Sequence, residues 1–407
     1  MRILMLKDYF YPEQCAGINL AQDLVNGFCE KNHFVEVYTP IPCRGISEEI
    51  KQDYRYKKLE KLGNATIHRY WLPYEKSGTL SRALRYLLQN IIQLCKGLSC
   101  SYDVLLLGST PPTMGLVGAV LKKLKRKPFV YNLQDIFPDS LVTGNITHEG
   151  SIIWKIGTII EKITYKNADH IIVISESFKN NLILKGVSEN KITVVNNWID
   201  VDEIKPVDKA ENKLFDEYDV SKDKFTVVYA GNFGKAQGAN IILESAKELK
   251  DYKDIQFVIF GGGSEFSNAK EYIQNNNLSN VIINGLLPIG RVSEVYSLGD
   301  VALITCKKGV GKAGMPSKTW SIMACNTPII ASFDINSELD SIITSANAGI
   351  CVEPQSKDEL CRAILEYKKR NLEVQKCGRI YVLENASKRK CVDRYIKVLE
   401  NESKKKV

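Results

Sequence analysis

Two glycine-rich turns in the second half of the sequence have the composition that phosphate binding requires. The first, residues 229–238, reads YAGNFGKAQG and carries one lysine, and the second follows the next apolar run as FGGG. Glycines allow a phosphate to approach the backbone closely, and a lysine supplies charge for a diphosphate. One such turn alone fits a structural role better, but two on successive strands favour a ligand. From them we predict a diphosphate site that contains Gly231, Asn232, Gly234, Lys235, Gly261, Gly262 and Gly263.

Two carboxylates in the first half of the chain have a position suited to proton transfer. They are Asp135 and Asp139, in the segment QDIFPDS that follows another apolar run. A positioned carboxylate can receive or orient the proton of a reacting hydroxyl. We favour Asp135 for this role. The alternative is structural, with either aspartate capping the helix that follows.

A third loop, YFYPEQCAG at residues 9–17, follows the first apolar run and brings Gly17 close to the start of a predicted helix. Ligands of open α/β sheets bind beyond the carboxyl ends of the strands, which is where this loop is expected to lie. Glu13 and Gly17 are its candidate contacts.

The sequence lacks the signatures of common cofactor and metal sites. No G-x-G-x-x-G opens the first helix with an acidic residue about twenty positions on, and there is no Walker lysine motif. The 11 cysteines fall singly, the four histidines have no partner at ligand spacing, and the Asp-x-Asp at residues 200–202 lies between the predicted domains. We therefore expect no cofactor and no metal.

Apolar runs alternate with amphipathic helical patterns along the 407 residues, which is typical of parallel sheets covered by helices. The predicted class is α/β, with two successive sheets. Predicted strands of the first are Arg2–Leu6, Phe34–Thr39, Ala65–Tyr70, Val104–Leu107, Phe129–Leu133, His170–Ile174 and Ile192–Val195. Those of the second are Phe225–Tyr229, Gln256–Phe260, Val281–Ile283, Val301–Ile304, Pro328–Ile330 and Gly349–Val352.

The stretch from Asn197 to Lys224 contains a proline, many charges and little apolar periodicity, and so predicts an interdomain link. We place the first domain at residues 1–205 and the second at 206–385. A lysine-rich helix at 386–407 is expected to pack back on the first domain.

Positive charge is concentrated in one region of the chain. Residues 51–127 contain 15 basic residues against four acidic ones, a surplus of 11, whereas the whole chain carries +8. No nucleic-acid motif accompanies this region. Because Leu80–Lys96 is amphipathic and basic, an anionic membrane surface is the favoured partner, with a solvated face and a core-packed helix as the alternatives. The uncharged run Val104–Leu121 carries Gly108, Pro111, Pro112 and Gly115 in its middle, and predicts strand, loop and helix rather than a membrane span.

Several motifs occur together in an order typical of one enzyme family. They are the FYPE loop, VISES at 173–177, VVNNWID at 194–200, YAGNFGKAQG, FGGG, MPSK at 315–318 and MACNTPIIA at 323–331. The chain thereby resembles family 4 of the retaining glycosyltransferases over its full length. It is most similar to the bacterial surface-polysaccharide branch that includes N-acetyl-L-fucosamine transferases, which share the DxFPDS and PSK segments. The resemblance implies the GT-B fold, two Rossmann-like domains with parallel sheets facing across a cleft. The acceptor would bind the first domain, including Glu13, Gly17 and Asp139, and the nucleotide sugar the second.

The chain departs from the family pattern at charged positions of the donor site. Two glutamates that hold the donor sugar and the ribose fall here on Ala313 and Ser321, and the Arg and Lys of the diphosphate loop fall on Asn232 and Gln237. We infer that Lys235 and Lys318 supply the missing positive charge, with Lys318 acting on the leaving diphosphate. The donor-side candidates from this part of the chain are Pro316, Ser317, Lys318, Ser321 and, for the ribose, Glu338.

These observations predict a retaining glycosyltransferase. It would move a sugar, an N-acetylated amino sugar or a 6-deoxyamino sugar, from a UDP-linked donor to a polyprenyl-diphosphate-linked glycan in capsule or O-antigen synthesis. It would be cytoplasmic, peripheral on the inner face of the cell membrane, without a nucleic-acid partner. The alternatives are a GT-B sugar-nucleotide epimerase and a non-catalytic partner subunit of a glycosyltransferase.

Overall fold

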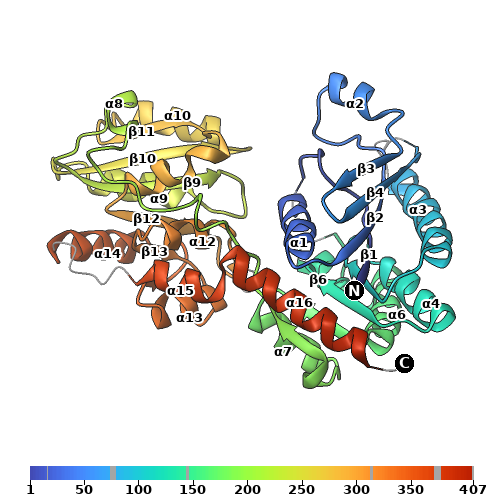
Figure 1. Cartoon of the computed structure of the whole chain (residues 1–407). Helices are drawn as coiled ribbons and strands as arrows, with labels where there is room; N and C mark the ends of the chain where they lie inside the picture. The colour runs from blue at the N-terminus through green and yellow to red at the C-terminus, as the bar shows by residue number, and fades with distance from the viewer. Residues whose placement is uncertain (16, 74–78, 144–145, 312–314, 371–376, 406–407) are drawn as a thin grey trace. The chain divides into compact units, whose positions relative to one another are not determined.

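The computed structural model describes residues 1–15, 17–73, 79–143, 146–311, 315–370 and 377–405. The chain divides into two compact units. Residues Met1–Asn197 and Arg389–Val407 form the first unit, and Trp198–Lys388 form the second. Each unit is an α/β domain built on one sheet (Figure 1).

The first unit contains an eight-stranded sheet of order β3-β4-β2-β1-β5-β6-β7-β8. All neighbouring strands are parallel except β3, which pairs antiparallel with β4 at the edge. The central strands are almost wholly buried, as parallel strands covered on both faces must be. The strands are β1 (Arg2–Leu6), β2 (Phe34–Pro40), β3 (Leu59–Leu62), β4 (Ala65–Tyr70), β5 (Val104–Gly108), β6 (Phe129–Leu133), β7 (His170–Val173) and β8 (Ile192–Val194).

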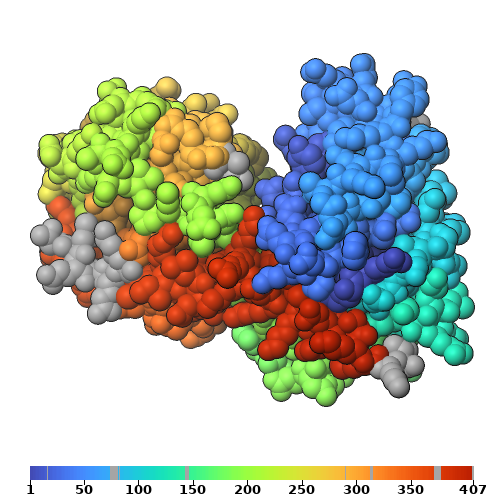
Figure 2. Space-filling view, viewed as in Figure 1, coloured from blue at the N-terminus to red at the C-terminus, as the bar shows by residue number. Residues whose placement is uncertain are grey.

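Helices cover both faces of this sheet. In Figure 1, α3, α4 and α6 lie on one face, and α1 and α16 lie on the other. Helix α16 contacts α1 so closely that a Cβ at Gly27 would come within 2.4 Å of Val392, and Figure 2 shows its surface against the amino-terminal residues. The helices are α1 (Ile18–Glu30), α2 (Glu48–Tyr54), α3 (Thr79–Ser99), α4 (Met114–Lys125), α5 (Asp139–Thr143), α6 (Ile152–Asn167), α7 (Glu176–Leu184) and α16 (Lys388–Lys404).

The second unit contains a six-stranded parallel sheet of order β11-β10-β9-β12-β13-β14. Separate apolar cores form on its two faces. Its strands are β9 (Phe225–Asn232), β10 (Ile255–Gly262), β11 (Val281–Gly285), β12 (Val301–Thr305), β13 (Ile329–Ser332) and β14 (Gly349–Val352). Its helices are α8 (Leu214–Glu217), α9 (Asn240–Glu248), α10 (Phe266–Asn275), α11 (Val292–Ser297), α12 (Lys318–Ala324), α13 (Glu338–Ser345), α14 (Lys357–Lys369) and α15 (Gly378–Asn385).

Each sheet reverses its strand order at one point. In the first unit this point lies between β1 and β5, and in the second between β9 and β12. Loops that leave the carboxyl ends of two such strands diverge to opposite faces and open a crevice, which is where α/β domains bind ligands. Ligands are therefore expected at the loops after β9 and β12 in the second unit and after β1 and β5 in the first.

The predicted α/β class and all the predicted strands are confirmed, with small differences at their ends. The run Val104–Leu121 forms β5, a loop and most of α4, as predicted. Within the described residues, no helix is both long and apolar enough to cross a membrane. The first unit ends at Asn197 rather than near residue 205, because Ile199 forms a bridge with Ser387 and so belongs to the second unit. The returning segment accordingly begins at Arg389, not at residue 386.

Candidate active site

Lys318 lies against the carboxyl end of β9, at the reversal point of the second sheet. It is the first residue of α12, and its Nζ atom is 4.1 Å from the centroid of the Tyr229 ring. Gly231 makes this approach possible: a Cβ there would lie 2.5 Å from Lys318 Nζ, and the glycine has a φ of 146°. The absence of a side chain at residue 231 thus leaves room for the lysine ammonium at the end of the strand.

The ammonium of Lys318 is held in surroundings that oppose its charge. Burial lowers the pKa of Lys318 from its ordinary 10.5 to about 8. The residue as a whole is partly exposed, so the low pKa reflects the packing of its tip against Gly231 and Tyr229. Among the described residues, no carboxylate forms an ion pair with it. A partly buried ammonium without a carboxylate partner is destabilised, and an anionic ligand would stabilise it. A lowered pKa of this kind is common among functional lysines.

The loop between β9 and α9 forms one wall of a pocket with a volume of about 340 Å³. It is held to the neighbouring loop by a hydrogen bond from the Lys307 backbone N–H to the Ala236 carbonyl, 2.9 Å long. Asn232 Nδ2 donates to Gln237 Oε1 across the loop, at 3.3 Å. These two side chains, which the family resemblance matched to an Arg and a Lys, therefore bind one another. Lining the pocket are Phe233, Gly234, Lys235, Gly238, Ala239, Asn240, Glu265 and Lys307.

The glycines after β10 let that strand end close to the β9 loop. A Cβ at Gly263 would lie 2.0 Å from Asn232 Oδ1, and one at Gly261 would lie 2.9 Å from the Phe233 ring. The backbone N–H of Phe233 donates to the Gly262 carbonyl at 2.6 Å. The two predicted glycine turns are therefore in contact, and their glycines serve this close packing.

The remaining donor-side candidates lie on two helices and the loops that precede them. Pro316 and Ser317 come directly before Lys318, and Ser321 follows one turn later on α12, partly buried. Glu338 begins α13, after the carboxyl end of the next strand. Ala313 lies outside the described residues.

Asp334, at the carboxyl edge of the second sheet, was not singled out from the sequence. It follows β13, is buried, and accepts hydrogen bonds from the backbone N–H groups of Gly309 and Gly311, both 2.8 Å long. Gln355 similarly donates to the carbonyls of Gly238 and Cys306, at 3.1 Å each. Both side chains fix loops at the carboxyl edge of the sheet. The sole sequence signal was a polar residue directly after an apolar strand.

The two aspartates of the first unit have different environments. Asp135 is exposed on the loop after β6, and its carboxylate accepts a hydrogen bond from Ser140 Oγ at 2.9 Å. Asp139 begins α5, and its carboxylate binds Lys185 Nζ and accepts from Asn181 Nδ2. Asp135 is thus the carboxylate of this loop that is open to solvent, whereas Asp139 belongs to an ion pair.

Glu13 is engaged within the loop that follows β1. It is 4% exposed, and its carboxylate accepts hydrogen bonds from the backbone N–H groups of Phe10, Cys43 and Arg44. Burial raises the pKa of Glu13 in spite of these bonds. Gly17 precedes α1 with a φ of 80°, and open space surrounds it. Glu13 therefore orders the loop, and Gly17 allows the turn into the helix.

Asp8 is a further residue at this edge that the sequence did not single out. It lies two residues after the end of β1, its Oδ2 atom is buried without a hydrogen-bond partner among the described residues, and burial raises its pKa. No cluster of three or more His, Cys, Asp or Glu side chains able to hold a metal occurs in the described part of the chain.

Two domain families match nearly consecutive parts of the chain. Residues 19–203 match Glycosyltransferase Family 4, and residues 210–381 match Glycosyl transferases group 1. The chain belongs to the glycosyltransferases. The predicted enzyme class is therefore confirmed, and the chain carries both glycosyltransferase domains that the resemblance implies.

The glycosyltransferase is similar to curated bacterial proteins over most of its length. It is 26% identical over 377 residues to the putative colanic acid biosynthesis glycosyl transferase WcaI of Escherichia coli K12, covering 89% of this chain and 91% of that protein. It is also 26% identical over 293 residues to the probable glycosyltransferase WbjE of Pseudomonas aeruginosa, covering 72% and 73%.

Solved structures show the same fold. Sucrose-phosphate synthase from Thermosynechococcus elongatus superposes with a TM-score of 0.71 at 15% identity, covering 98% of both chains. Anabaena HepE in complex with UDP superposes with a TM-score of 0.71 at 14% identity, covering 98% of this chain and 100% of that one. The predicted GT-B class is confirmed by these neighbours, which at such identities establish the fold alone.

Proposed function

We propose that the glycosyltransferase is a retaining enzyme that takes a sugar from a UDP-linked donor and adds it to a polyprenyl-diphosphate-linked glycan. The sugar is an N-acetylated amino sugar or a 6-deoxyamino sugar, as in the N-acetyl-L-fucosamine transferase branch, and the product is a capsule or O-antigen precursor. The enzyme works without a metal, on the cytoplasmic face of the membrane.

The buried ammonium of Lys318 carries the donor half of this proposal. It lies at the reversal point of the second sheet, with Gly231 leaving room for it and no carboxylate bound to it among the described residues. A nucleoside diphosphate supplies the negative charge that this lysine lacks. The similarity in fold to a protein solved with UDP supports a uridine nucleotide. The similarity to the colanic acid protein supports a polysaccharide product.

In the proposed reaction, a hydroxyl oxygen of the acceptor forms a bond to the anomeric carbon of the sugar. The bond between that carbon and the diphosphate oxygen breaks, and the electron pair leaves with UDP. Lys318 stabilises the charge that develops on the diphosphate, which is where a fixed cation lowers the barrier most. Asp135, exposed on the acceptor-side unit, receives the hydroxyl proton.

Ligand-dependent thermal stability tests the donor half. UDP should raise the melting temperature of the wild-type protein, while GDP, ADP and CDP at equal concentration should have little effect. Lys318→Ala should remove most of the UDP effect. A protein protected equally by all four nucleotides, or a Lys318→Ala variant protected as well as wild type, would contradict the donor assignment.

Slow hydrolysis of UDP-sugars by the purified protein would then identify the donor. A panel of UDP-linked N-acetylated sugars should contain one that is hydrolysed to free sugar and UDP. If the sugar instead stays attached to UDP and is converted to its epimer, the protein is the epimerase of the alternative prediction. Complete absence of turnover, with UDP still bound, would favour a partner subunit without catalysis.

A further inference from the structure

Three neighbouring helices of the first unit present apolar side chains to solvent. Helix α6 exposes five isoleucines, each between 40% and 77% accessible, on one stripe of its surface. Single exposed apolar residues are ordinary, but a contiguous patch marks an interaction surface. The residues are Ile152, Ile153, Ile156, Ile159 and Ile163 on α6, Val120 and Leu124 on α4, and Leu84, Leu87, Leu88, Ile91 and Leu98 on α3. We call this set the apolar face.

Helix α3 buries polar side chains and exposes apolar ones, whereas an ordinary surface helix does the reverse. Its buried positions include Arg85, Gln89 and Gln93, spaced four residues apart and at most 5% exposed. Gln93 Nε2 donates to the Lys7 carbonyl at 2.8 Å, and Arg85 Nε donates to the Pro73 carbonyl at 2.9 Å. An amphipathic helix on a soluble domain buries its apolar stripe instead. Four leucines of α3 are exposed opposite these inward polar side chains, whereas Leu94 packs partly buried against the core.

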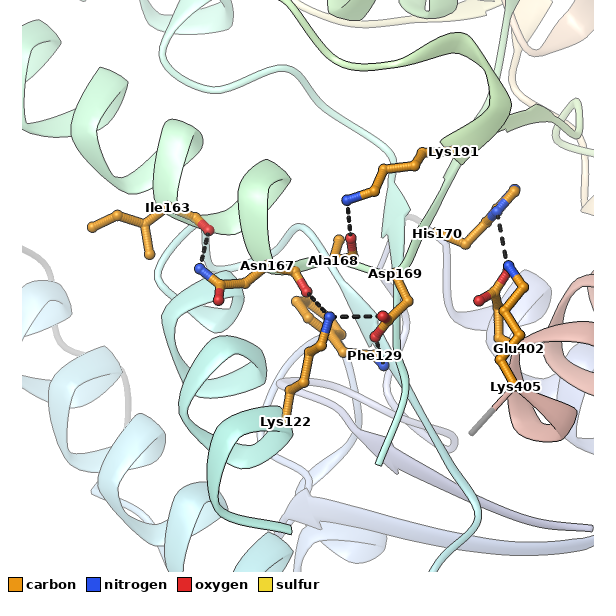
Figure 3. A network of polar contacts seen from close by, with 10 residues as sticks. All are labelled: Lys122, Phe129, Ile163, Asn167, Ala168, Asp169, His170, Lys191, Glu402 and Lys405. Carbon is orange, nitrogen blue, oxygen red and sulfur yellow. Dashed lines mark hydrogen bonds and ion pairs between the residues drawn. The ribbon is translucent and has the colours of Figure 1, made fainter. Parts of the chain in front are cut away.

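The three helices form one continuous surface because small residues let them approach. A Cβ at Gly97 of α3 would come within 2.6 Å of Leu121 on α4, and one at Gly115 of α4 would come within 2.0 Å of Thr164 on α6. The base of α4 and α6 is fixed by the network in Figure 3. There Lys122 Nζ donates to the Asn167 carbonyl and binds Asp169, and Lys191 donates to the Ala168 carbonyl. The apolar face is thus held as a rigid unit.

The exposed charges on the three helices themselves have one sign. Helices α3 and α4 contain no acidic residue, and α6 contains only Glu161. Glu161 is 7% exposed and its carboxylate binds Lys185 Nζ at 2.6 Å, so it offers no negative charge to a partner. Among the side chains of these helices that the structure describes, the exposed cations are Lys96, Lys123, Lys155, Lys162 and Lys166.

A pocket opens on the side of α6 next to the isoleucine stripe. It has a volume of about 530 Å³ and lies between α6 and the loop that precedes β8. Four lysines line it together with Asp139 and Glu161, both of which bind Lys185, so the exposed Lys162 and Lys166 supply its free positive charge. A phosphate head group can therefore meet cations directly beside a surface suited to its acyl chains.

We propose that the apolar face docks on the surface of an anionic lipid bilayer, with the isoleucines of α6 inserted at the level of the acyl chains. Apolar insertion and attraction between lysines and anionic head groups act together in such interfacial binding. The contact surface differs from the basic region 51–127 in its main element, since α6 lies outside that region. This inference deepens the membrane association proposed above, and its test does not depend on sugar transfer.

Vesicle co-sedimentation tests the proposal with a matched pair of variants. Ile159→Glu places a charge in the stripe, and Ile380→Glu makes the same change on α15 of the second unit, where the isoleucine is equally exposed at 58%. Wild type should bind vesicles of phosphatidylcholine with phosphatidylglycerol more tightly than phosphatidylcholine alone, and salt should weaken the binding. Ile159→Glu should reduce binding about tenfold or more, the loss expected for one buried isoleucine. Ile380→Glu should bind as wild type does.

A variant that carries both Lys155→Gln and Lys162→Gln tests the contribution of charge. It should weaken binding to the anionic vesicles by about tenfold or more while leaving the protection by UDP unchanged. The proposal is overturned if Ile159→Glu binds like wild type, or if Ile380→Glu loses as much. It is also overturned if the wild-type protein binds no vesicles but forms a dimer that Ile159→Glu dissociates. The apolar face would then be an interface between two copies of the chain.

Discussion

At the scale of single residues, replacing Lys318 should have two opposite effects: a gain in stability and a loss of UDP binding. Its folded-state pKa of about 8 lies below the ordinary 10.5, so the folded protein binds this proton more weakly than the unfolded chain does. The stability that accompanies the neutral form is present above the ordinary pKa and lost as the pH falls through about 8. Lys318→Met should therefore raise the melting temperature at neutral pH. The same variant should lose most of the protection by UDP, and a variant that is less stable than wild type would contradict the assigned burial.

The pH dependence of UDP binding follows from the same group. If the diphosphate binds the protonated lysine, as proposed, affinity should fall as the pH rises through about 8, with proton uptake on binding in that range. Calorimetric titration with UDP from about pH 7 to about pH 9, in two buffers of different ionisation enthalpy, measures both effects. Lys318→Met should show weak binding that does not change over this interval. Wild-type affinity that is flat across the interval would exclude a contact between Lys318 and the diphosphate.

Turnover gives the next residue-scale prediction. Lys318→Ala should cost on the order of 2 to 4 kcal/mol of transition-state stabilisation in the identified donor reaction. Asp135→Asn should lower kcat while leaving the affinity for UDP unchanged, because Asp135 lies on the other unit and, in the proposed reaction, serves the acceptor. Loss of UDP binding in Asp135→Asn, or turnover of Lys318→Ala within about threefold of wild type, would refute the respective role.

From the sequence, Lys235 and Lys318 both supply the diphosphate's positive charge, with Lys318 acting on the leaving group, and the structure places them in different surroundings. Lys235 is exposed on its turn, whereas the ammonium of the partly exposed Lys318 packs against Gly231 and Tyr229. The difference depends on a contact between residues far apart in the chain and on the φ of one glycine, and neither can be read from spacing. Asp334 escaped notice for the same reason, since its partners are backbone N–H groups on a different loop.

At the scale of elements, the parallel strands were predictable because burial on both faces makes them continuous apolar runs. The edge strand β3 was missed because its residues Leu59–Leu62 are mostly exposed and mixed in polarity. The amphipathic pattern of α3 was visible, but a helical period does not tell which face points inward. That direction depends on the bond between Gln93 and the Lys7 carbonyl, which only the folded chain reveals.

Helix α4 provides the element-scale prediction. A Cβ at Gly118 would lie 2.5 Å from the Phe129 ring, so Gly118→Ala must push α4 away from β6. We expect a loss of about 1 to 3 kcal/mol in the free energy of unfolding, the usual cost of overpacking. Gly285→Ala is the matched control, because nothing lies within 4 Å of its added Cβ. Equal denaturant midpoints for the two variants would show that α4 can move without cost.

At the scale of the whole molecule, α16 makes the first unit discontinuous in sequence. It buries Val392, Tyr395 and Leu399, and Tyr395 donates a hydrogen bond to Asn132 Oδ1 at 3.0 Å. A chain that ends after Lys388 should lose the calorimetric transition of the first unit, or show it at a much lower temperature, while that of the second unit persists. Tyr395→Phe should cost about 1 kcal/mol, the value of one hydrogen bond. Two unchanged transitions in the shortened chain would show that α16 is dispensable.

The return of α16 to α1 has a consequence for how the protein is made. A ribosome releases the amino-terminal residues first, yet the unit they belong to lacks a buried helix until residues 389–404 have been synthesised. The second unit, continuous from Trp198 to Lys388, can complete its core earlier. Synthesis order and completion order are therefore reversed between the two units. During translation the surface of α1 around Gly27, which α16 later covers, is exposed and open to chaperones.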